Sequence, residues 1–188
     1  FFLRKYEKKN IAIFSDRSIG YYLSVISVIL SGNTWIQFSN STPKKKIEKI
    51  IKFSNIKLGI IDKTFKHKIT KKIKLCKFED IIKSKDEKSF NFNHINHKDI
   101  ACIFFTSGST GEPKGVNISY LNLTESTNYQ LKNINYSNNE IFADCHDTTF
   151  VMSINTIFPM VSNNCTISPL MGTYDRIFPS EHFKKNKI

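Results

Sequence analysis

Paired cysteines and long apolar runs are both missing from this chain. Its four cysteines form no C-x-x-C pair, so we predict reduced, partly buried thiols in a cytoplasmic protein. No apolar run reaches the roughly 20 residues that a membrane-spanning helix needs, and the first ten residues are too charged for a secretion signal. We therefore expect no membrane partner.

An initiator methionine is also missing, because the sequence starts at Phe1. We expect the chain to begin inside a longer gene product. Acidic residues are few: 16 Asp and Glu stand against 28 Lys and Arg, a formal net charge of +12. A non-enzymatic basic module that binds nucleic acid is one alternative that fits this charge. However, the lysines are spread along the chain and no aromatic residues alternate with a basic groove, so we interpret the charge as compositional.

The chain contains a regular alternation of short apolar runs and helical patterns. Strands are predicted over Ile11–Phe14, Thr34–Phe38, Lys57–Ile61, Ile73–Phe78, Ile100–Phe105 and Cys165–Pro169. Helices are predicted over Ile19–Leu30, from Thr42-Pro43 onward, over Ser119–Asn133 and over Phe150–Met160. Short links between these elements predict an α/β fold with a mostly parallel sheet flanked by helices. No domain boundary is evident.

Two of the predicted helices have contrasting surfaces. The helix Ile19–Leu30 is apolar on nearly every side and is expected to be well buried. The helix after Pro43 has a buried stripe of Ile47, Ile50 and Ile51. Its lysines are interpreted as a solvated face and not as a binding site; they are Lys44, Lys45, Lys46, Lys49 and Lys52.

A glycine-rich segment, Thr106–Gly115, follows the apolar run Ile100–Phe105 directly. Its glycines permit positive φ and close approach of the backbone to a ligand, and its hydroxyls and amides suit anionic oxygens. Lys114 adds a positive charge beside Pro113. The spacing does not fit a P-loop, a dinucleotide fingerprint or a nucleophile elbow. The segment therefore predicts a phosphate-binding loop of another kind.

The run Thr-Ser-Gly-Ser-Thr-Gly-Glu-Pro-Lys-Gly-Val, at Thr106–Val116, resembles the phosphate-binding signature of the adenylate-forming superfamily. That superfamily includes acyl-CoA synthetases, luciferases and amino-acid adenylation domains. Upstream, Asp16-Arg17-Ser18 and the stretch Ile29–Phe38 resemble amino-acid adenylation domains. The resemblance extends from about Ile11 to Pro169 and implies the first part of the large N-terminal domain of such an enzyme.

The resemblance implies an ATP-dependent ligase that activates a carboxylic acid to an acyl-adenylate and releases pyrophosphate, with ATP and Mg²⁺ as cofactors. It implies that the β- and γ-phosphates are held by Thr106, Ser107, Gly108, Ser109, Thr110, Gly111 and Lys114, of which Lys114 and Thr110 are the expected catalytic residues. An amino acid is the favoured substrate, and a carrier protein or coenzyme A is the implied acceptor. An acyl- or aryl-CoA synthetase is the alternative within this chemistry.

A second segment is expected to face the acid. His146-Asp147-Thr148-Thr149 looks like a variant of the aromatic-Asp-x-Ser segment of amino-acid adenylation domains, in which the Asp binds the substrate amine. Asp147 would then pair with an ammonium group, and His146 would shape the acyl site. The structural alternative is that Asp147 caps a helix. His94 and His97 lack an obvious third ligand, so they are interpreted as loop residues and no metal-binding side chain is expected.

Later motifs of the superfamily, including its mobile C-terminal domain, are not found before Ile188. Residues 1–188 are therefore expected to be a partial N-terminal adenylation domain, truncated at both ends and inactive when isolated. A decayed gene remnant is the remaining alternative.

Overall fold

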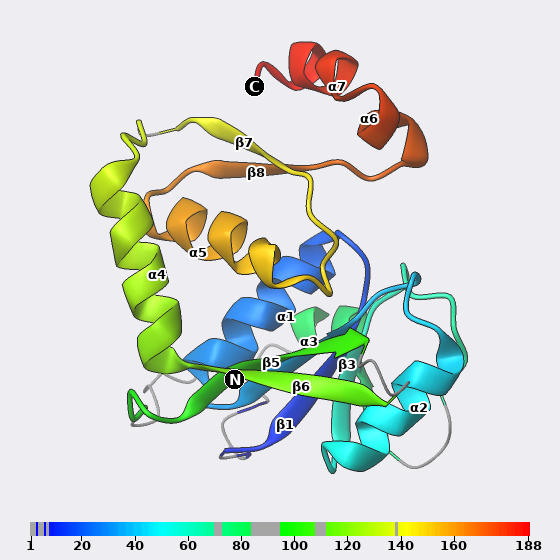
Figure 1. Ribbon diagram of the computed structural model, residues 1–188. Helices are drawn as coiled ribbons and strands as arrows, with labels where there is room; N and C mark the ends of the chain where they lie inside the picture. Colours follow the sequence, from blue (N-terminus) through cyan, green and yellow to red (C-terminus); the bar gives the residue numbers. More distant parts are fainter. Residues whose placement is uncertain are drawn as a thin grey trace. The chain divides into compact units, whose positions relative to one another are not determined.

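The computed structural model describes residues 3, 6, 8–69, 73–83, 95–107, 112–137 and 139–188. Contacts divide the chain into two compact units, Phe1–Tyr120 and Leu121–Ile188, whereas the sequence shows no boundary there. Each unit is described by itself below (Figure 1).

The first unit is built on a six-stranded sheet of order β4-β3-β1-β2-β5-β6. Its strands are β1 (Asn10–Phe14), β2 (Thr34–Phe38), β3 (Leu58–Ile61), β4 (Lys74–Lys77), β5 (Ile100–Ser107) and β6 (Pro113–Ser119). All neighbouring pairs are parallel except β5–β6, which is antiparallel. The predicted α/β fold with a mostly parallel sheet is therefore confirmed. The antiparallel strand β6 was not predicted.

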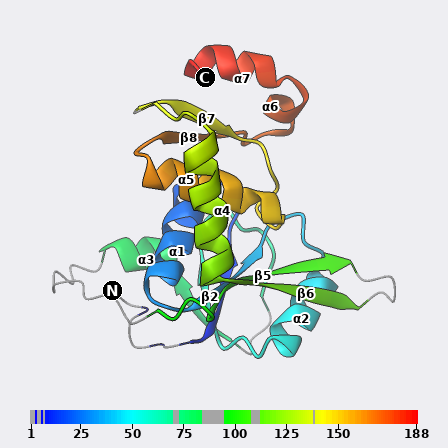
Figure 2. The same cartoon turned by 60° about the vertical axis from the view of Figure 1, so that its left-hand side comes forward.

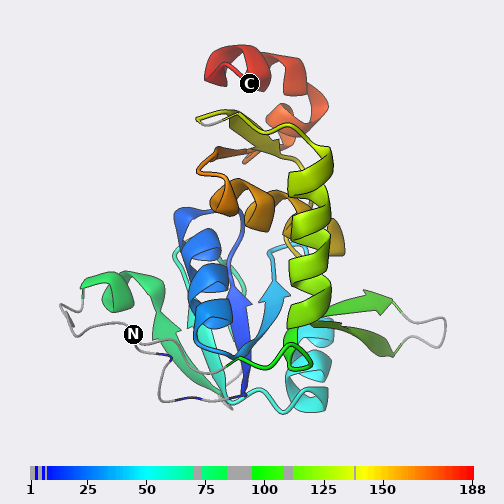
Figure 3. The same cartoon turned by 90° about the vertical axis from the view of Figure 1, so that its left-hand side faces the viewer.

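Helices α1 (Ile19–Leu30) and α2 (Lys44–Phe53) cover opposite faces of this sheet (Figure 3). Successive residues of a strand point to opposite faces, so the contacts of each strand assign the helices. Phe14 and Phe38 belong to one core cluster with the stripe of α2, which consists of Ile47, Ile50 and Ile51 as predicted. On the other face, Trp35 contacts Tyr21 of α1 with ring centroids 6.3 Å apart. The connections β1-α1-β2 and β2-α2-β3 therefore run over opposite faces of the sheet.

Helix α1 begins at its predicted residue because Ser18 caps it: the Ser18 hydroxyl accepts a hydrogen bond of 3.1 Å from the Tyr21 amide. It ends before Gly32, whose φ of 71° is in the region that favours glycine. The expectation that this helix is well buried holds for one side, where Tyr21, Val25 and Val28 are buried, whereas Ile19 is 69% exposed and Leu23 is 42% exposed. In α2, Pro43 is the residue before the first helical turn and not its first member.

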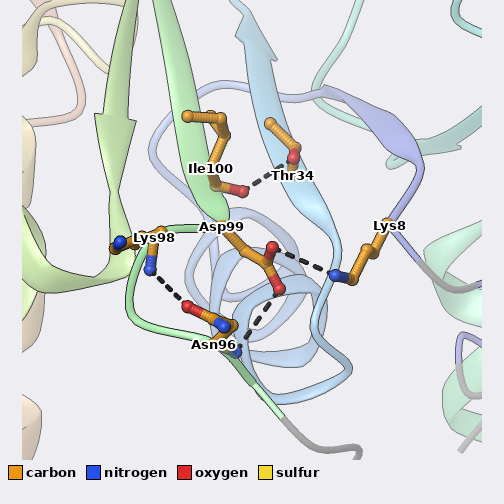
Figure 4. A network of polar contacts seen from close by, with 6 residues as sticks. All are labelled: Lys8, Thr34, Asn96, Lys98, Asp99 and Ile100. Carbon is orange, nitrogen blue, oxygen red and sulfur yellow. Dashed lines mark hydrogen bonds and ion pairs between the residues drawn. The ribbon is translucent and has the colours of Figure 1, made fainter.

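The start of β5 is fixed by a polar network at the edge of the first unit (Figure 4). The Thr34 hydroxyl of β2 donates a hydrogen bond of 2.7 Å to the Ile100 carbonyl. The Asp99 carboxylate forms an ion pair with the Lys8 ammonium at 3.1 Å. It also accepts a hydrogen bond from the backbone amide of Asn96. These contacts set where β5 enters the sheet, so they also set which residues reach its far end.

Short helix α3 (Phe78–Lys83) follows β4, in agreement with the predicted strand and helical turn after Ile73. The end of the first unit is anchored through Tyr120, which begins α4 (Tyr120–Asn133). Its hydroxyl donates to the carbonyls of Ile29 and Asn33, at 3.0 and 2.9 Å. Tyr120 thereby ties the residue after β6 to the end of α1.

The second unit contains a two-stranded parallel sheet of β7 (Ile141–Asp144) and β8 (Thr166–Pro169), which lie side by side in Figure 2. Between them lie the 3-10 helix η2 (Val151–Ser153) and α5 (Ile154–Ser162), which makes a β-α-β unit. Helices α6 (Thr173–Ile177) and α7 (Pro179–Asn186) follow; β7 and α6 were not predicted. His182 of α7 contacts Ser168 of β8 at 3.0 Å.

Within the described ranges, we find no helix that has both the length and the apolar character needed to cross a membrane.

Candidate functional site

The segment predicted to bind phosphate is a β-hairpin rather than a continuous loop, because both of its ends are strands. Thr106 pairs with Lys114, and Ser107 pairs with Pro113, in the antiparallel ladder of β5 and β6. Cross-strand partners stand on the same face of a sheet, so Thr106 and Lys114 present a hydroxyl and an ammonium group together. Both residues are exposed. The hairpin extends past α2 in Figures 2 and 3.

The four residues predicted to form the centre of the site lie outside the described residues: Gly108, Ser109, Thr110 and Gly111. Their assignment stays a prediction. For Ser107 the structure describes the backbone alone, as part of β5. Of the predicted phosphate-binding side chains, the structure therefore places Thr106 and Lys114, and it brings these two together.

Gly115 is required for a reason other than positive φ. Among the described glycines, only Gly32 has a positive φ. A Cβ on Gly115 would lie 3.1 Å from Cγ2 of Ile103 and 3.1 Å from Cε1 of Phe105, its cross-strand partner. The Phe105 ring thus lies against the backbone of Gly115. Close approach of this ring explains the glycine that follows Lys114.

Two lysines of α2 contact the hairpin near the end of β5 and the start of β6, although the sequence predicts a purely solvated face there. The Lys46 ammonium donates a hydrogen bond of 3.3 Å to the Phe105 carbonyl. The Lys49 ammonium forms an ion pair of 2.6 Å with Glu112, the residue before Pro113. Lys46 therefore holds the β5 arm and Lys49 holds the β6 arm. Sequence reasoning gave no role to either lysine or to Glu112.

The crevice between the carboxyl ends of β1 and β3 is the place where an α/β sheet of this topology commonly binds a ligand, since the chain leaves these neighbouring strands in opposite directions. Here Asp62, which is only 7% exposed, fills it. Its carboxylate accepts from the hydroxyls of Ser15, at 2.6 Å, and of Ser18. A Cβ on Gly20 would lie 2.6 Å from that carboxylate. The Asp62 side chain, with the hydroxyls that it accepts from, therefore lies at the carboxyl ends of these two strands.

The predicted acid-facing residues, His146 and Asp147, follow β7 in the second unit. They lie in the connection from the carboxyl end of β7 to α5, the edge of a β-α-β unit where ligand-binding residues are common. Asp147 Oδ1 accepts hydrogen bonds from the amide and the hydroxyl of Thr149, at 2.9 and 2.7 Å. This is a turn of the Asx type, so Asp147 caps a turn rather than a helix, and Phe150 precedes the first helical residue.

In the parts of the chain that are described, no group of three or more His, Cys, Asp and Glu side chains could hold a metal ion. His94 lies outside the described residues. All four cysteines are free thiols, as predicted, and burial raises the pKa of Cys102 to about 12. Cys102 is therefore a neutral core residue and no candidate for a nucleophile.

The sequence of this chain matches a known protein family. The family described as AMP-binding enzyme matches residues 3–186 of this sequence. The chain belongs to the AMP-binding enzyme family. The resemblance inferred from Thr106–Val116 is thus confirmed, and the chain is a member of a family of adenylate-forming enzymes.

Relatives among curated proteins are synthases and ligases by name. The chain is 29% identical over 161 residues to bacitracin synthase 1 of Bacillus licheniformis, covering 83% of this chain and 3% of the relative. It is 28% identical over 163 residues to the D-alanine–D-alanyl carrier protein ligase of Staphylococcus aureus (strain JH9), covering 86% of this chain and 33% of the relative. The chain thus spans a third or less of the length of these relatives.

Solved structures agree with the fold. The N-terminal subdomain of Klebsiella oxytoca NpsA, in complex with 3-hydroxybenzoyl-AMSN, matches with a TM-score of 0.81 at 20% identity, covering 97% of this chain and 46% of that one. The Vibrio cholerae adenylation domain AlmE, in complex with glycyl-adenosine-5'-phosphate, matches with a TM-score of 0.81 at 18% identity, covering 100% of this chain and 40% of that one. The predicted fold, that of the first part of an adenylation domain, is therefore confirmed.

Proposed function

We propose that this protein activates a carboxylic acid, preferably an amino acid, to an acyl-adenylate at the expense of ATP, with release of pyrophosphate. The observation that carries the proposal is the β5–β6 hairpin, in which the Thr106 hydroxyl and the Lys114 ammonium share one face. Membership of the AMP-binding enzyme family over residues 3–186 supports it. The name of the D-alanine–D-alanyl carrier protein ligase favours an amino acid as substrate.

The side chains of the hairpin offer the hydrogen-bond donors and the positive charge that a polyphosphate requires. Lys114 offers three N–H donors and a positive charge, and Thr106 offers a hydroxyl donor. We propose that Thr106, Ser107 and Lys114 act with Gly108, Ser109, Thr110 and Gly111 to hold the β- and γ-phosphates and to orient the leaving pyrophosphate. Charge-assisted hydrogen bonds contribute about 1.5–3 kcal/mol each, so a few suffice for useful affinity. ATP supplies the phosphorus that the carboxylate attacks.

Magnesium is proposed to enter with the nucleotide, since Mg²⁺ is usually held by substrate phosphates, several waters and one or two carboxylates. The described residues offer no acidic cluster that would form a separate site for it. Positioning and charge neutralisation by the hairpin are therefore the contribution that we assign to this part of the chain.

Asp147 and His146 are proposed to contact the acid. One oxygen of Asp147 accepts two hydrogen bonds from Thr149, and a carboxylate has capacity for further donors, such as a substrate ammonium. We further propose that residues 1–188 form part of the N-terminal domain of a longer enzyme, that the isolated chain is inactive, and that the acceptor is a carrier protein. The proposal that the enzyme is longer is supported by the curated relatives, because the chain spans a third or less of their length.

Exchange of labelled pyrophosphate into ATP tests the proposal. The protein as its gene encodes it should catalyse this exchange with at least one of the twenty amino acids, and the exchange should require Mg²⁺. If only aryl or fatty acids supported exchange, the proposed substrate would be one of these acids and not an amino acid, which would favour a CoA ligase. No exchange with amino, aryl or fatty acids would contradict the proposed function.

A further inference from the structure

Helix α2 presents a second stripe, distinct from its buried isoleucines, to the hairpin. Lys46, Lys49 and Phe53 are spaced by three and four residues, so they lie on one face of the helix. Lys46 bonds the Phe105 carbonyl, Lys49 pairs with Glu112, and the Phe53 ring lies 6.4 Å from the Phe105 ring. This face of α2 therefore contacts both arms of the hairpin at the base of its turn.

Among these contact residues, Glu112 has a charge that is unfavourable for binding a polyphosphate. It is the only acidic residue of the signature, and it lies two residues from Lys114. Two residues of extended chain span at most about 7 Å, which is shorter than the Debye length of about 8 Å at physiological salt. A free carboxylate at this place would attract the Lys114 ammonium and repel a polyphosphate. Both effects would weaken binding of an anion by the hairpin.

The contact with Lys49 turns this carboxylate away. Phe105 packs with the core cluster on the α2 side of the sheet, so the next residue, Thr106, and its partner Lys114 point to the opposite face. Lys49 belongs to α2 and holds Glu112 at 2.6 Å. The Glu112 carboxylate is thus held towards α2, and the Lys114 ammonium stands on the other side of the hairpin.

We propose that Lys49 is a positioning residue that sequesters Glu112 and so keeps Lys114 available for the phosphates of the nucleotide. This proposal rests on the proposed function of the hairpin. Lys49 itself touches no phosphate in this scheme, because its ammonium is already committed to Glu112. The Lys46 contact holds the neighbouring arm and keeps α2 against the hairpin.

A double-mutant cycle separates this role from simple bracing. In the protein as its gene encodes it, K49A should raise the dissociation constant of Mg-ATP and its KM in pyrophosphate exchange about fivefold at low salt, with a smaller change in kcat. E112Q should weaken binding less than K49A does. Adding E112Q to K49A should lower the dissociation constant again, since no free carboxylate then remains.

Salt and a neighbouring lysine provide the controls. The effect of K49A should shrink at about 1 M salt, where charges are screened beyond about 3 Å. K45A removes the same charge from the same helix, at an exposed position, and should change the dissociation constant less than twofold. K49R should restore most of the affinity, because arginine keeps the charge.

The outcomes distinguish the two proposals. If K49A/E112Q binds Mg-ATP as weakly as K49A, Lys49 is only a brace and the sequestration proposal is wrong. If no acid supports exchange while Mg-ATP still binds, the proposed function fails, and the order of the dissociation constants still decides the role of Lys49. If wild-type protein does not bind Mg-ATP, both proposals are wrong.

Discussion

The Ser15 hydroxyl donates a hydrogen bond of 2.6 Å to the carboxylate of Asp62 and so joins the carboxyl ends of β1 and β3. The same carboxylate accepts from the Thr64 amide at 2.8 Å and from the Ser18 hydroxyl at the start of α1. A buried acceptor shared by several donors is costly to remove, because each donor then loses its partner. Asp62 therefore stabilises the first unit.

D62A should lower the free energy of unfolding by about 2–3 kcal/mol, since buried donors are left without an acceptor. The measurement is urea unfolding followed by the emission of Trp35, the single tryptophan, which is 1% exposed in the first unit. D80A removes an exposed aspartate of α3 and should change stability by less than about 0.5 kcal/mol. Equal effects of the two substitutions would contradict this assignment.

Gly115 provides a test of the hairpin's packing. G115A places a methyl group 3.1 Å from Ile103 and from the Phe105 ring, so these side chains must shift by a few tenths of an ångström. We expect a loss of about 1–2 kcal/mol in the free energy of unfolding and weaker binding of Mg-ATP. At Gly172 a Cβ would meet no atom closer than 3.7 Å, so G172A should change stability by less than about 0.5 kcal/mol. A G115A protein as stable as G172A would refute the close contact.

Lys114 is the strongest candidate for a direct phosphate contact. K114A should lower kcat/KM for ATP about tenfold to a hundredfold, which corresponds to the loss of one or two charge-assisted hydrogen bonds. The readout is pyrophosphate exchange at saturating acid. K66A is the matched control, because Lys66 is exposed and its backbone amide, not its ammonium, bonds Asn40 at 2.7 Å. An unchanged kcat/KM in K114A would remove the lysine from the site.

The buried thiol of Cys102 should make the free energy of unfolding depend on pH in the alkaline range. Burial raises the pKa of this thiol from 9.0 to about 12, so between these values the unfolded chain loses a proton that the folded protein keeps. The free energy of unfolding should therefore fall as the pH rises through this range. C102A should flatten the dependence, measured by urea unfolding from pH 8 to 11.

Alkylation provides an independent test of whether the Cys102 thiol is buried. At pH 8, iodoacetamide should modify the exposed Cys145 readily and should reach the buried Cys102 only after denaturant is added. Peptide mass spectrometry would identify the labelled residues. Rapid labelling of Cys102 in the native protein would contradict its burial.

Much of the first unit could be predicted from the sequence because each local signal agrees with the tertiary packing. Ile19–Leu30 has Ser18 before it and Gly32 after it, and the structure reproduces both of its ends. The strand Thr34–Phe38 is likewise reproduced, since β-branched and aromatic residues favour strands.

Other features depend on tertiary contacts that a local pattern does not carry. Strand β6, Pro113–Ser119, contains a proline and a glycine and has little apolar alternation, so only its pairing with β5 makes it a strand. The contact of Lys49 with Glu112 joins residues 63 positions apart, and nothing in either local sequence indicates it. The signature predicted the site's chemistry, whereas its arrangement as a hairpin came from long-range pairing.

The register of β5 and β6 constrains how this hairpin can change in length during evolution. If Val116 were deleted while Asn117 stayed opposite Ile103, Lys114 would move opposite Phe105 and point towards α2. An odd deletion within the strand would therefore carry the ammonium group through the sheet to the side that already holds Lys46 and Lys49. Homologous chains should accordingly accept gained or lost residues between the two strands far more often than within β6.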